Sequence, residues 1–286
     1  MRTIATVGIM AKPKIAGAAE IVCSLLEWLR RRGLTFRCDE QTATYANLTD
    51  FYSREEVPCG ADIVIVLGGD GTLLSAARFV AGLDIPLFAV NLGHLGFLTA
   101  TKLEDLFEEL EQVLDGNYRL GRRRMLDCEI VRDGQSIVTF SALNDIVIAK
   151  TELARMIDLD TYVGDHFVAA YKADGLIVAT PTGSTAYSLS AGGPVIFPSV
   201  AAFCITPICP HMLTNRPVIV PDTSVIRILS RSEAGSYLTV DGQVGEPLER
   251  GDRVVCRSSP KSIQLIRPPK MLFFDVLREK LKWGER

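Results

Sequence analysis

The chain has 286 residues, of which 48% are hydrophobic and 23% charged, and its formal net charge at pH 7 is −3. This length suits one large domain or two ordinary ones with ample core, because domains usually hold roughly 100–200 residues. The slightly negative charge offers no general attraction to nucleic acid or to an anionic membrane, so we expect neither as a partner.

Cysteine usage and hydropathy point to the cytoplasm. The seven cysteines are odd in number and show no CxxC spacing, which favours reduced thiols over disulfides or a zinc site. The N-terminal residues read as a strand rather than a signal peptide. No uncharged run approaches the roughly 18 apolar residues of a membrane span. We therefore expect a cytoplasmic protein.

The first 118 residues alternate between strand and helix patterns. Helical spacing covers 16–34, and a capping box formed by Thr101 and Glu104 predicts a second helix that ends near Gly116. The predicted strands are 4–10, 35–38, 64–67 and 86–90. This alternation is typical of a doubly wound parallel sheet, which binds ligands at the carboxyl ends of its strands.

One of those strand ends carries the glycine-rich sequence Gly68-Gly69-Asp70-Gly71-Thr72. The run before it reads as a buried strand, and the residues after Thr72 favour a helix. Glycines let the backbone approach phosphate oxygens, and the helix N-terminus directs N–H groups at them. Asp70 is then a base for a substrate hydroxyl or a partner for Mg²⁺. The alternative is a hairpin, because Asp-Gly favours type I′ turns, but 72–77 is poor strand material.

Helical spacing almost disappears after Tyr118, so we expect a β-rich, sandwich-like domain over 119–270 after an α/β domain over 1–118. The segments 126–131 and 137–142, joined by Asp133-Gly134, read as a hairpin. Further strands are predicted at 145–149, 158–163, 167–171, 175–180, 218–220, 225–229, 237–240 and 253–257. Within the tail 271–286, the segment 274–283 looks helical, and we expect this tail to pack back on the first domain.

A second glycine- and hydroxyl-rich stretch follows the predicted strand 175–180. Residues 180–187 have the local chemistry for holding phosphates and riboses, although Ser and Thr that merely cap a helix give the same pattern. Asn144-Asp145 and Asp241-Gly242-Gln243, each taken alone, read as turns. Each of the three histidines, at 94, 166 and 211, is better explained as structural than as a ligand.

Together these motifs resemble those of the NAD kinase family, and the resemblance covers about residues 3–270. The Gly-Gly-Asp-Gly-Thr loop also occurs in diacylglycerol and sphingosine kinases. The segment 174–194, combined with Asn144-Asp145, is what singles out NAD kinases. The matching segments are 68–72, 91–97, 144–145, 174–193 and 241–243.

The resemblance implies Mg²⁺-dependent transfer of the γ-phosphoryl group of ATP to the adenosine ribose 2′-hydroxyl of NAD, in a homodimer or homotetramer. Asp70 would be the general base, and Mg²⁺ would be bound with ATP rather than by protein ligands. Gly68, Gly69 and Thr72 would face the phosphate donor. The NAD-binding residues would be Asp70, Gly71, Phe97, Asn144, Asp145, Arg155, Lys172, Asp174, Thr182, Thr185, Ala186, Tyr187, Ser188, Leu189, Ser190 and Gln243.

Two other functions stay open at this point. A lipid kinase could use the same glycine loop, but residues 180–187 suit a polar dinucleotide, and no membrane-docking helix stands out. A non-catalytic NAD(P) sensor is the other, and the presence of Asp70 argues against it. The sequence leaves open ATP against polyphosphate, NAD against NADH, and feedback by NADP(H).

Two residues depart from the family pattern. Ser75 stands where many members place a basic residue facing the donor, which leaves the donor preference open. Phe197 stands where relatives often carry a polar residue before the proline, so it alters a pocket wall or a subunit contact.

Overall fold

The computed structural model describes residues 3–93, 96–99, 101–151, 155–233, 235–267 and 272–283, so the expectation for His94 lies outside them. The chain divides into two compact units. One comprises Met1–Arg122 with Ile263–Arg286, and the other comprises Arg123–Ser262.

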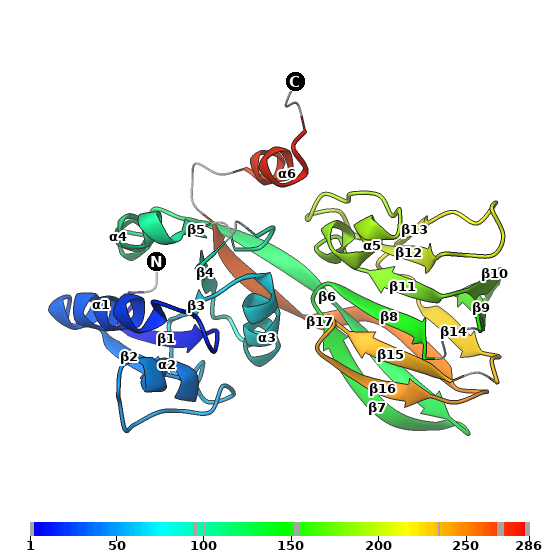
Figure 1. The fold of residues 1–286 in the computed structure, drawn as a ribbon, viewed down its shortest axis with the longest axis horizontal. Coiled ribbons are helices and arrows are strands. Elements are labelled where there is room, and N and C mark those ends of the chain that lie inside the picture. The colour runs from blue at the N-terminus through cyan, green and yellow to red at the C-terminus, as the bar shows by residue number, and fades with distance from the viewer. Residues whose placement is uncertain are drawn as a thin grey trace. The chain divides into compact units, whose positions relative to one another are not determined.

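The first unit is built on a parallel sheet with flanking helices (Figure 1). Its strands run in the order β4-β3-β1-β2, so the chain leaves β1 in one direction to reach β2 and returns on the other side of β1 as β3. The switch point, where such sheets bind ligands, therefore lies at the carboxyl ends of β1 and β3. The strands are β1 (Thr6–Ala11), β2 (Thr35–Cys38), β3 (Ile63–Leu67), β4 (Leu87–Asn91) and the short β5 (Thr101–Lys102).

Helices of this unit pack on its sheet through apolar faces. Leu25, Leu26 and Leu29 of α1 and Leu110 of α4 join the buried core formed with strands β1, β3 and β4. The helices are α1 (Ala18–Arg31), α2 (Glu40–Tyr45), α3 (Asp70–Val80), α4 (Leu106–Leu114) and α6 (Phe273–Leu281), with a 3-10 turn η1 (Leu103–Asp105). The predicted doubly wound α/β architecture is confirmed.

The prediction of a capping box at Thr101 and Glu104 was wrong. Thr101 belongs to β5, where it pairs with Val90 of β4, so its backbone serves the sheet instead of starting a helix. Neither η1 nor α4 has a side-chain cap at its N-terminus. A second difference concerns α3, which begins at Asp70 rather than after Thr72.

The second unit is a two-layer arrangement of antiparallel strands (Figure 1). One layer has the order β13-β12-β11-β8-β15-β16, and the other includes β10-β9-β14-β17 with the hairpin β6-β7 beside β17. Alternate residues from both layers form one buried core. The strands are β6 (Arg119–Arg132), β7 (Gln135–Ala142), β8 (Asp145–Lys150), β9 (Ile157–Val163), β10 (His166–Ala173), β11 (Gly175–Ala179), β12 (Ala202–Ile208), β13 (Val218–Pro221), β14 (Ile226–Ser230), β15 (Ser236–Val240), β16 (Val244–Leu248) and β17 (Arg253–Arg267).

The predicted β-rich, sandwich-like architecture of this second unit is confirmed. Its outer sheet face is covered by the segment that contains the 3-10 turn η2 (Gly183–Thr185) and the helix α5 (Tyr187–Ser190). Ile196 from just beyond α5 packs there against Val147, Ile177 and Cys204. The hydroxyl-rich segment is therefore anchored directly on β8, β11 and β12.

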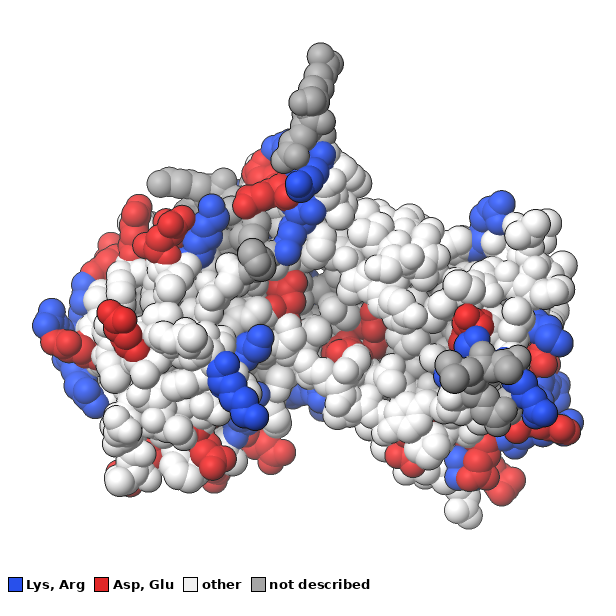
Figure 2. Space-filling model, viewed as in Figure 1, with Lys and Arg blue, Asp and Glu red and all other residues white. Residues whose placement is uncertain are grey.

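Surface charge and hydropathy add two observations. On the face shown in Figure 2, basic and acidic side chains are interspersed rather than gathered into one basic surface. Among the helices of the described residues, none combines the length and the apolar character needed to cross a membrane.

Candidate active site

The Asp70 carboxylate lies at the first residue of α3 and is tightly held. Its Oδ2 accepts a hydrogen bond from the backbone N–H of Phe97 at 2.8 Å. Its Oδ1 accepts from the N–H groups of Leu98 and Thr99, both at 3.1 Å, and from the Thr99 hydroxyl at 3.0 Å. A carboxylate offers about four acceptor positions, so the segment 97–99 fixes both the place and the orientation of Asp70.

Two glycines near Asp70 are required by close approach. A Cβ on Gly96 would lie 2.0 Å from Asp70 Oδ1 and 2.3 Å from the Thr99 hydroxyl oxygen. A Cβ on Gly68 would lie 2.4 Å from the Thr72 hydroxyl oxygen. By contrast, a Cβ on Gly69 or Gly71 would meet nothing within 4 Å, so the outer side of the glycine loop is open.

Two further residues of the first unit have defined surroundings. Phe97 is half-buried, and the ammonium group of Lys280 on α6 lies 5.9 Å from its ring centre. Ser75 is bonded to an arginine that the sequence did not single out, because Arg54 Nη1 donates to Ser75 Oγ at 3.1 Å.

In the second unit, Asn144 and Asp145 lie at the start of β8 and are positioned by Asp241. One Asp241 oxygen accepts from the N–H of Asn144 at 2.7 Å and of Asp145 at 3.1 Å, while the other accepts from Leu143 N at 3.0 Å. The Asp241-Gly242 turn was predicted correctly as a hairpin turn, since it joins β15 to β16 with both residues at positive φ. Its anchoring role was missed, because nothing in the sequence places position 241 beside 144.

The polar atoms at this turn are buried and poised to bind a ligand. Asp145 is only 4% exposed, and burial together with the neighbouring Asp241 raises the pKa of its carboxyl to about 7. The Asn144 Oδ1 oxygen is buried and has no hydrogen-bond partner among the described residues. A buried acceptor of this kind normally has a partner, so this oxygen suits the hydroxyl group of a ligand.

The hydroxyl-rich segment after β11 packs against the same turn. Thr180 Oγ donates to the carbonyl oxygen of Leu143 at 2.6 Å. A Cβ on Gly183 would lie 2.0 Å from the carbonyl oxygen of Asn144. Thr182 and Thr185 are buried nearby, whereas Tyr187 is exposed. Ser188 is fully buried, and its hydroxyl lies 3.0 Å from that of Thr206. Several of these hydroxyls therefore hold the segment together, but none caps η2 or α5 at its N-terminus, so the helix-capping alternative was wrong. The remaining sequence-predicted residues here are Ala186, Leu189 and Ser190, beside or within α5, and Gln243, at the β15–β16 turn.

The other predicted residues of this unit lie at the opposite end of the same strands. Ala179 of β11 pairs with Asp145, and five residues earlier Asp174 is bonded to Lys150 at 2.6 Å. About 17 Å of strand therefore separates Asp174 from Asp145, at roughly 3.4 Å per residue. Arg155 and Lys172 lie near this far end.

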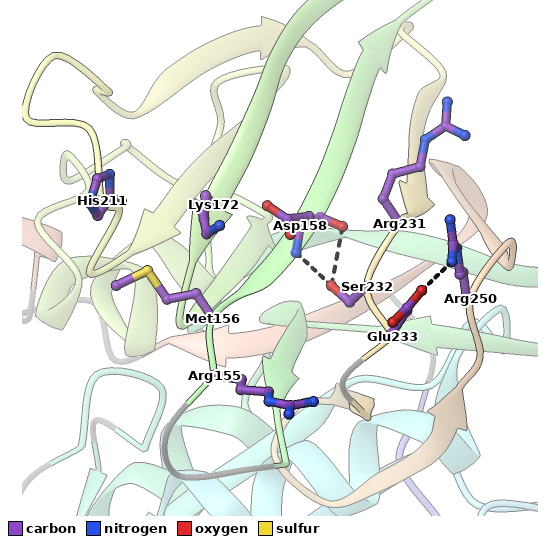
Figure 3. A pocket seen from close by; sticks show the side chains of 9 residues that line it. All are labelled: Arg155, Met156, Asp158, Lys172, His211, Arg231, Ser232, Glu233 and Arg250. Atoms are coloured by element: carbon purple, nitrogen blue, oxygen red, sulfur yellow. Dashed lines mark hydrogen bonds and ion pairs between the residues drawn. The ribbon is translucent and has the colours of Figure 1, made fainter.

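Arg155 and Lys172 line a common pocket of about 610 Å³ (Figure 3). Two other basic residues of this pocket are paired with acidic partners, Arg250 with Glu233 at 2.6 Å and Arg231 with Asp160 at 2.8 Å. The other lining residues are Met156, Asp158, His211 and Ser232. The sequence-predicted NAD residues of the second unit thus form two groups at the two ends of β8 and β11.

Comparison with known proteins agrees with these motifs. Residues 7–118 match the model of the ATP-NAD kinase N-terminal domain, and residues 143–268 match that of the ATP-NAD kinase C-terminal domain. The chain is 62% identical to the NAD kinase of Solibacter usitatus over 287 residues, with all of both chains covered. It is 50% identical to the NAD kinase of Koribacter versatilis, over 98% of this chain and 99% of the relative.

Solved structures show the same relationship. The yeast NADH kinase complexed with NADH superposes with a TM-score of 0.91 at 27% identity, over 100% of this chain and 89% of that one. The Archaeoglobus fulgidus NAD kinase in complex with ATP superposes with a TM-score of 0.78 at 25% identity, over 97% and 98% of the two chains. Because full-length relatives and both domain models agree, the chain belongs to the NAD kinase family.

Proposed function

We propose that this kinase transfers the γ-phosphoryl group of ATP to the 2′-hydroxyl of the adenosine ribose of NAD, giving NADP and ADP. The observation that carries this proposal is the Asp70 carboxylate, held by four hydrogen bonds at the end of the glycine loop. The ribose oxygen attacks the γ-phosphorus, the bond to the β-phosphate oxygen breaks, and Asp70 takes the hydroxyl proton. General-base help of this kind contributes about 10²–10⁴-fold.

Asp70 can accept a bond from a substrate hydroxyl at Oδ2, because this oxygen accepts one hydrogen bond, from Phe97 N–H, whereas Oδ1 accepts three. We expect the ribose hydroxyl to donate to Oδ2, which leaves the bonds from the segment 97–99 in place.

The donor enters as its magnesium complex, so Mg²⁺ is part of the substrate. Within the described residues, no group of three or more His, Cys, Asp or Glu side chains is arranged to hold a metal ion. Gly68, Gly69 and Thr72 lie beside the first turn of α3, where backbone N–H groups and the helix dipole favour phosphate oxygens. The complex of the Archaeoglobus relative supports ATP as the donor.

Residues of both units are proposed to contact the dinucleotide. We propose that Asn144 Oδ1 and Asp145 bind hydroxyls of the nicotinamide-side ribose, with Thr182, Thr185 to Ser190 and Gln243 around them. Phe97 is proposed to stack near the adenine, beside Gly71. The complex of the yeast relative supports binding of a nicotinamide dinucleotide.

A homodimer or homotetramer would complete this site. Arg155, Lys172 and Asp174 lie at the far end of β8 and β11 from Asp145, so we propose that they serve a dinucleotide bound to another copy of the chain. The domain boundaries 1–118 and 119–270 and the cytoplasmic location stay predictions from the sequence. The comparisons above support neither a lipid kinase nor a non-catalytic sensor.

Replacement of Asp70 by Asn tests the general base. The Asp70→Asn variant should lose at least a hundredfold in kcat while it still binds NAD, because the amide cannot accept the proton. The measurement is a coupled assay for NADP formation, with calorimetry for NAD binding and polyphosphate and NADH as parallel substrates.

Asp62→Asn is the matched control. Its carboxylate also accepts backbone N–H groups, from Ala5 at 2.8 Å and Thr6 at 2.9 Å, but it lies just before β3, at the opposite end of that strand from the glycine loop. This variant should lose stability and keep kcat. Unchanged kcat in Asp70→Asn would remove the proposed base.

A further inference from the structure

An arginine in the connection between α2 and β3 joins three elements around the switch point of the first unit. Arg54 Nε donates to Asp39 Oδ2 at 2.9 Å, Nη1 donates to Ser75 Oγ at 3.1 Å, and Nη2 donates to the Ala11 carbonyl oxygen at 2.9 Å. Asp39 directly follows β2, Ser75 lies on α3, and Ala11 is the last residue of β1. The guanidinium is therefore fixed in one position by elements that the sequence keeps far apart.

That position is close to the open side of the glycine loop. Ser75 lies four residues after Gly71 on α3, so the two share a helix face about 6 Å apart along the axis. Gly71 is exposed, and a Cβ there would meet nothing within 4 Å. Lys12, the residue after Ala11, is exposed, and its Cβ would lie 3.0 Å from a Cβ on Gly68. Lys12 thus lies beside the loop, and Arg54 lies about one helical turn beyond it, at Ser75.

Arg54 retains donors for a ligand and is partly exposed. A guanidinium has five N–H groups, and the bonds to described residues use three of them, one on each nitrogen. Its side chain is 29% exposed, and it also lines a pocket of about 740 Å³ whose other residues are Asp39 and members of α2 and of the segment 51–56 rather than of the glycine loop. Asp39, which is only 2% exposed, neutralises the arginine and holds it in place.

We propose that Arg54 binds phosphate oxygens of ATP beside the first turn of α3, and so positions the donor for transfer. The two remaining N–H groups, one on each terminal nitrogen, match the geometry in which arginine holds a phosphate by two parallel bonds. Asp39, Ser75 and the Ala11 carbonyl pre-organise the side chain for this contact. The proposal rests on the proposed function, because it deepens how that reaction holds its donor.

The test separates donor binding from acceptor binding. Arg54→Gln should raise the KM for ATP about 10–100-fold and leave the KM for NAD within about twofold, since a charge-assisted hydrogen bond is lost only to the donor. Calorimetric titration with MgATP in the absence of NAD should show the same loss of affinity. Arg54→Lys, which keeps a charge without the planar fork, should give an intermediate KM for ATP.

A second variant guards against a folding defect, because Arg54→Gln leaves the buried Asp39 without its ion pair. In Asp39→Asn/Arg54→Gln both charges are removed and Asn still serves as the N-cap of α2, so the melting temperature should recover while the KM for ATP stays high. Arg37→Gln is the matched control. Its guanidinium stacks on Tyr52 at 3.6 Å and donates to the Glu56 carbonyl oxygen at 2.9 Å, so the KM for ATP should not change.

Three outcomes would overturn the role of Arg54. They are a normal KM for ATP in the folded double variant, an equal rise in both KM values, and an equal effect of Arg37→Gln. In each of these outcomes the wild-type protein still forms NADP, so only the role of Arg54 is overturned. Failure of the wild-type protein to form NADP would instead overturn the proposed function.

Discussion

At the scale of single residues, the fold raises the pKa of the Asp145 carboxyl, and this makes the stability of the protein depend on pH. Burial, and then the nearby carboxylate of Asp241, raise the pKa of Asp145 to about 7 from 3.8. In the unfolded chain the carboxyl loses its proton near its ordinary pKa. The folded protein therefore loses stability as the pH rises from about 4 to about 7, and the loss is complete above that range.

The variant Asp145→Asn should consequently be more stable than the wild-type protein, and more so at pH 8 than at pH 5. We expect a gain of roughly 1–3 kcal/mol in the free energy of unfolding at pH 8, together with weaker NAD binding. Urea unfolding at the two pH values, without nucleotide, measures the gain. An equal difference at pH 5 and pH 8 would show that the pKa of Asp145 is not raised.

At the scale of elements, the protein contains two Asp-Gly hairpin turns with different duties. Asp133-Gly134 joins β6 to β7 and Asp241-Gly242 joins β15 to β16, and all four residues have positive φ. Asp133 is exposed, whereas Asp241 is 8% exposed and accepts three backbone N–H groups from the start of β8. The same turn chemistry thus forms a plain connection in one place and supports the Asn144-Asp145 turn in the other.

Replacing each of the two turn aspartates by asparagine compares their roles. Asp133→Asn should be neutral, because asparagine suits a type I′ turn as well as aspartate does. Asp241→Asn loses part of the acceptor set, so we expect about tenfold weaker NAD binding and a loss of about 1–3 kcal/mol in stability. Calorimetry with NAD and thermal unfolding compare the two variants, and identical behaviour of both would refute the anchoring role of Asp241.

At the scale of the whole molecule, the two groups of proposed NAD-binding residues in the second unit require explanation. Asn144 and Asp145 lie at one end of β8 and β11, and Asp174, Lys172 and Arg155 lie at the other. A rigid antiparallel sheet cannot bring these ends together. A second copy of the chain can supply the missing group, because symmetric association presents the far end of one sheet to another chain.

Complementation checks this arrangement. Asp145→Ala and Arg155→Ala should each be poorly active alone, but a mixed dimer then carries one site with both defects and one intact site. Co-expression should therefore restore about a quarter of the wild-type activity, since half of the dimers are mixed, and mixed dimers purified through two different affinity tags should have about half. Activity no higher than that of the separate variants would mean that both residues act within one chain.

The order of motifs along the chain determined much about this protein by itself. Alternating strand and helix periodicity predicted the parallel sheet with β2 at 35–38, and period-two patterns predicted most strands of the second unit. Several elements were not predicted, among them α2, β5, β12 and β16. The short polar α2 and the irregular β16 carry little periodicity, and β12, which is buried on every residue, contains a proline and shows no alternation. Local patterns predict elements because they depend on neighbours in the chain.

Only the tertiary structure decided which of those residues work together. Asp241 supports Asn144 from 97 positions away, Thr99 holds Asp70 from 29, and Arg54 reaches Ser75 from 21. The same topology places Arg155 and Lys172 at the far end of β8 and β11 from Asp145, although all belong to one family pattern. Such contacts depend on strand order and register, which local side-chain patterns do not encode, and so residue types were readable from the sequence while their partners were not.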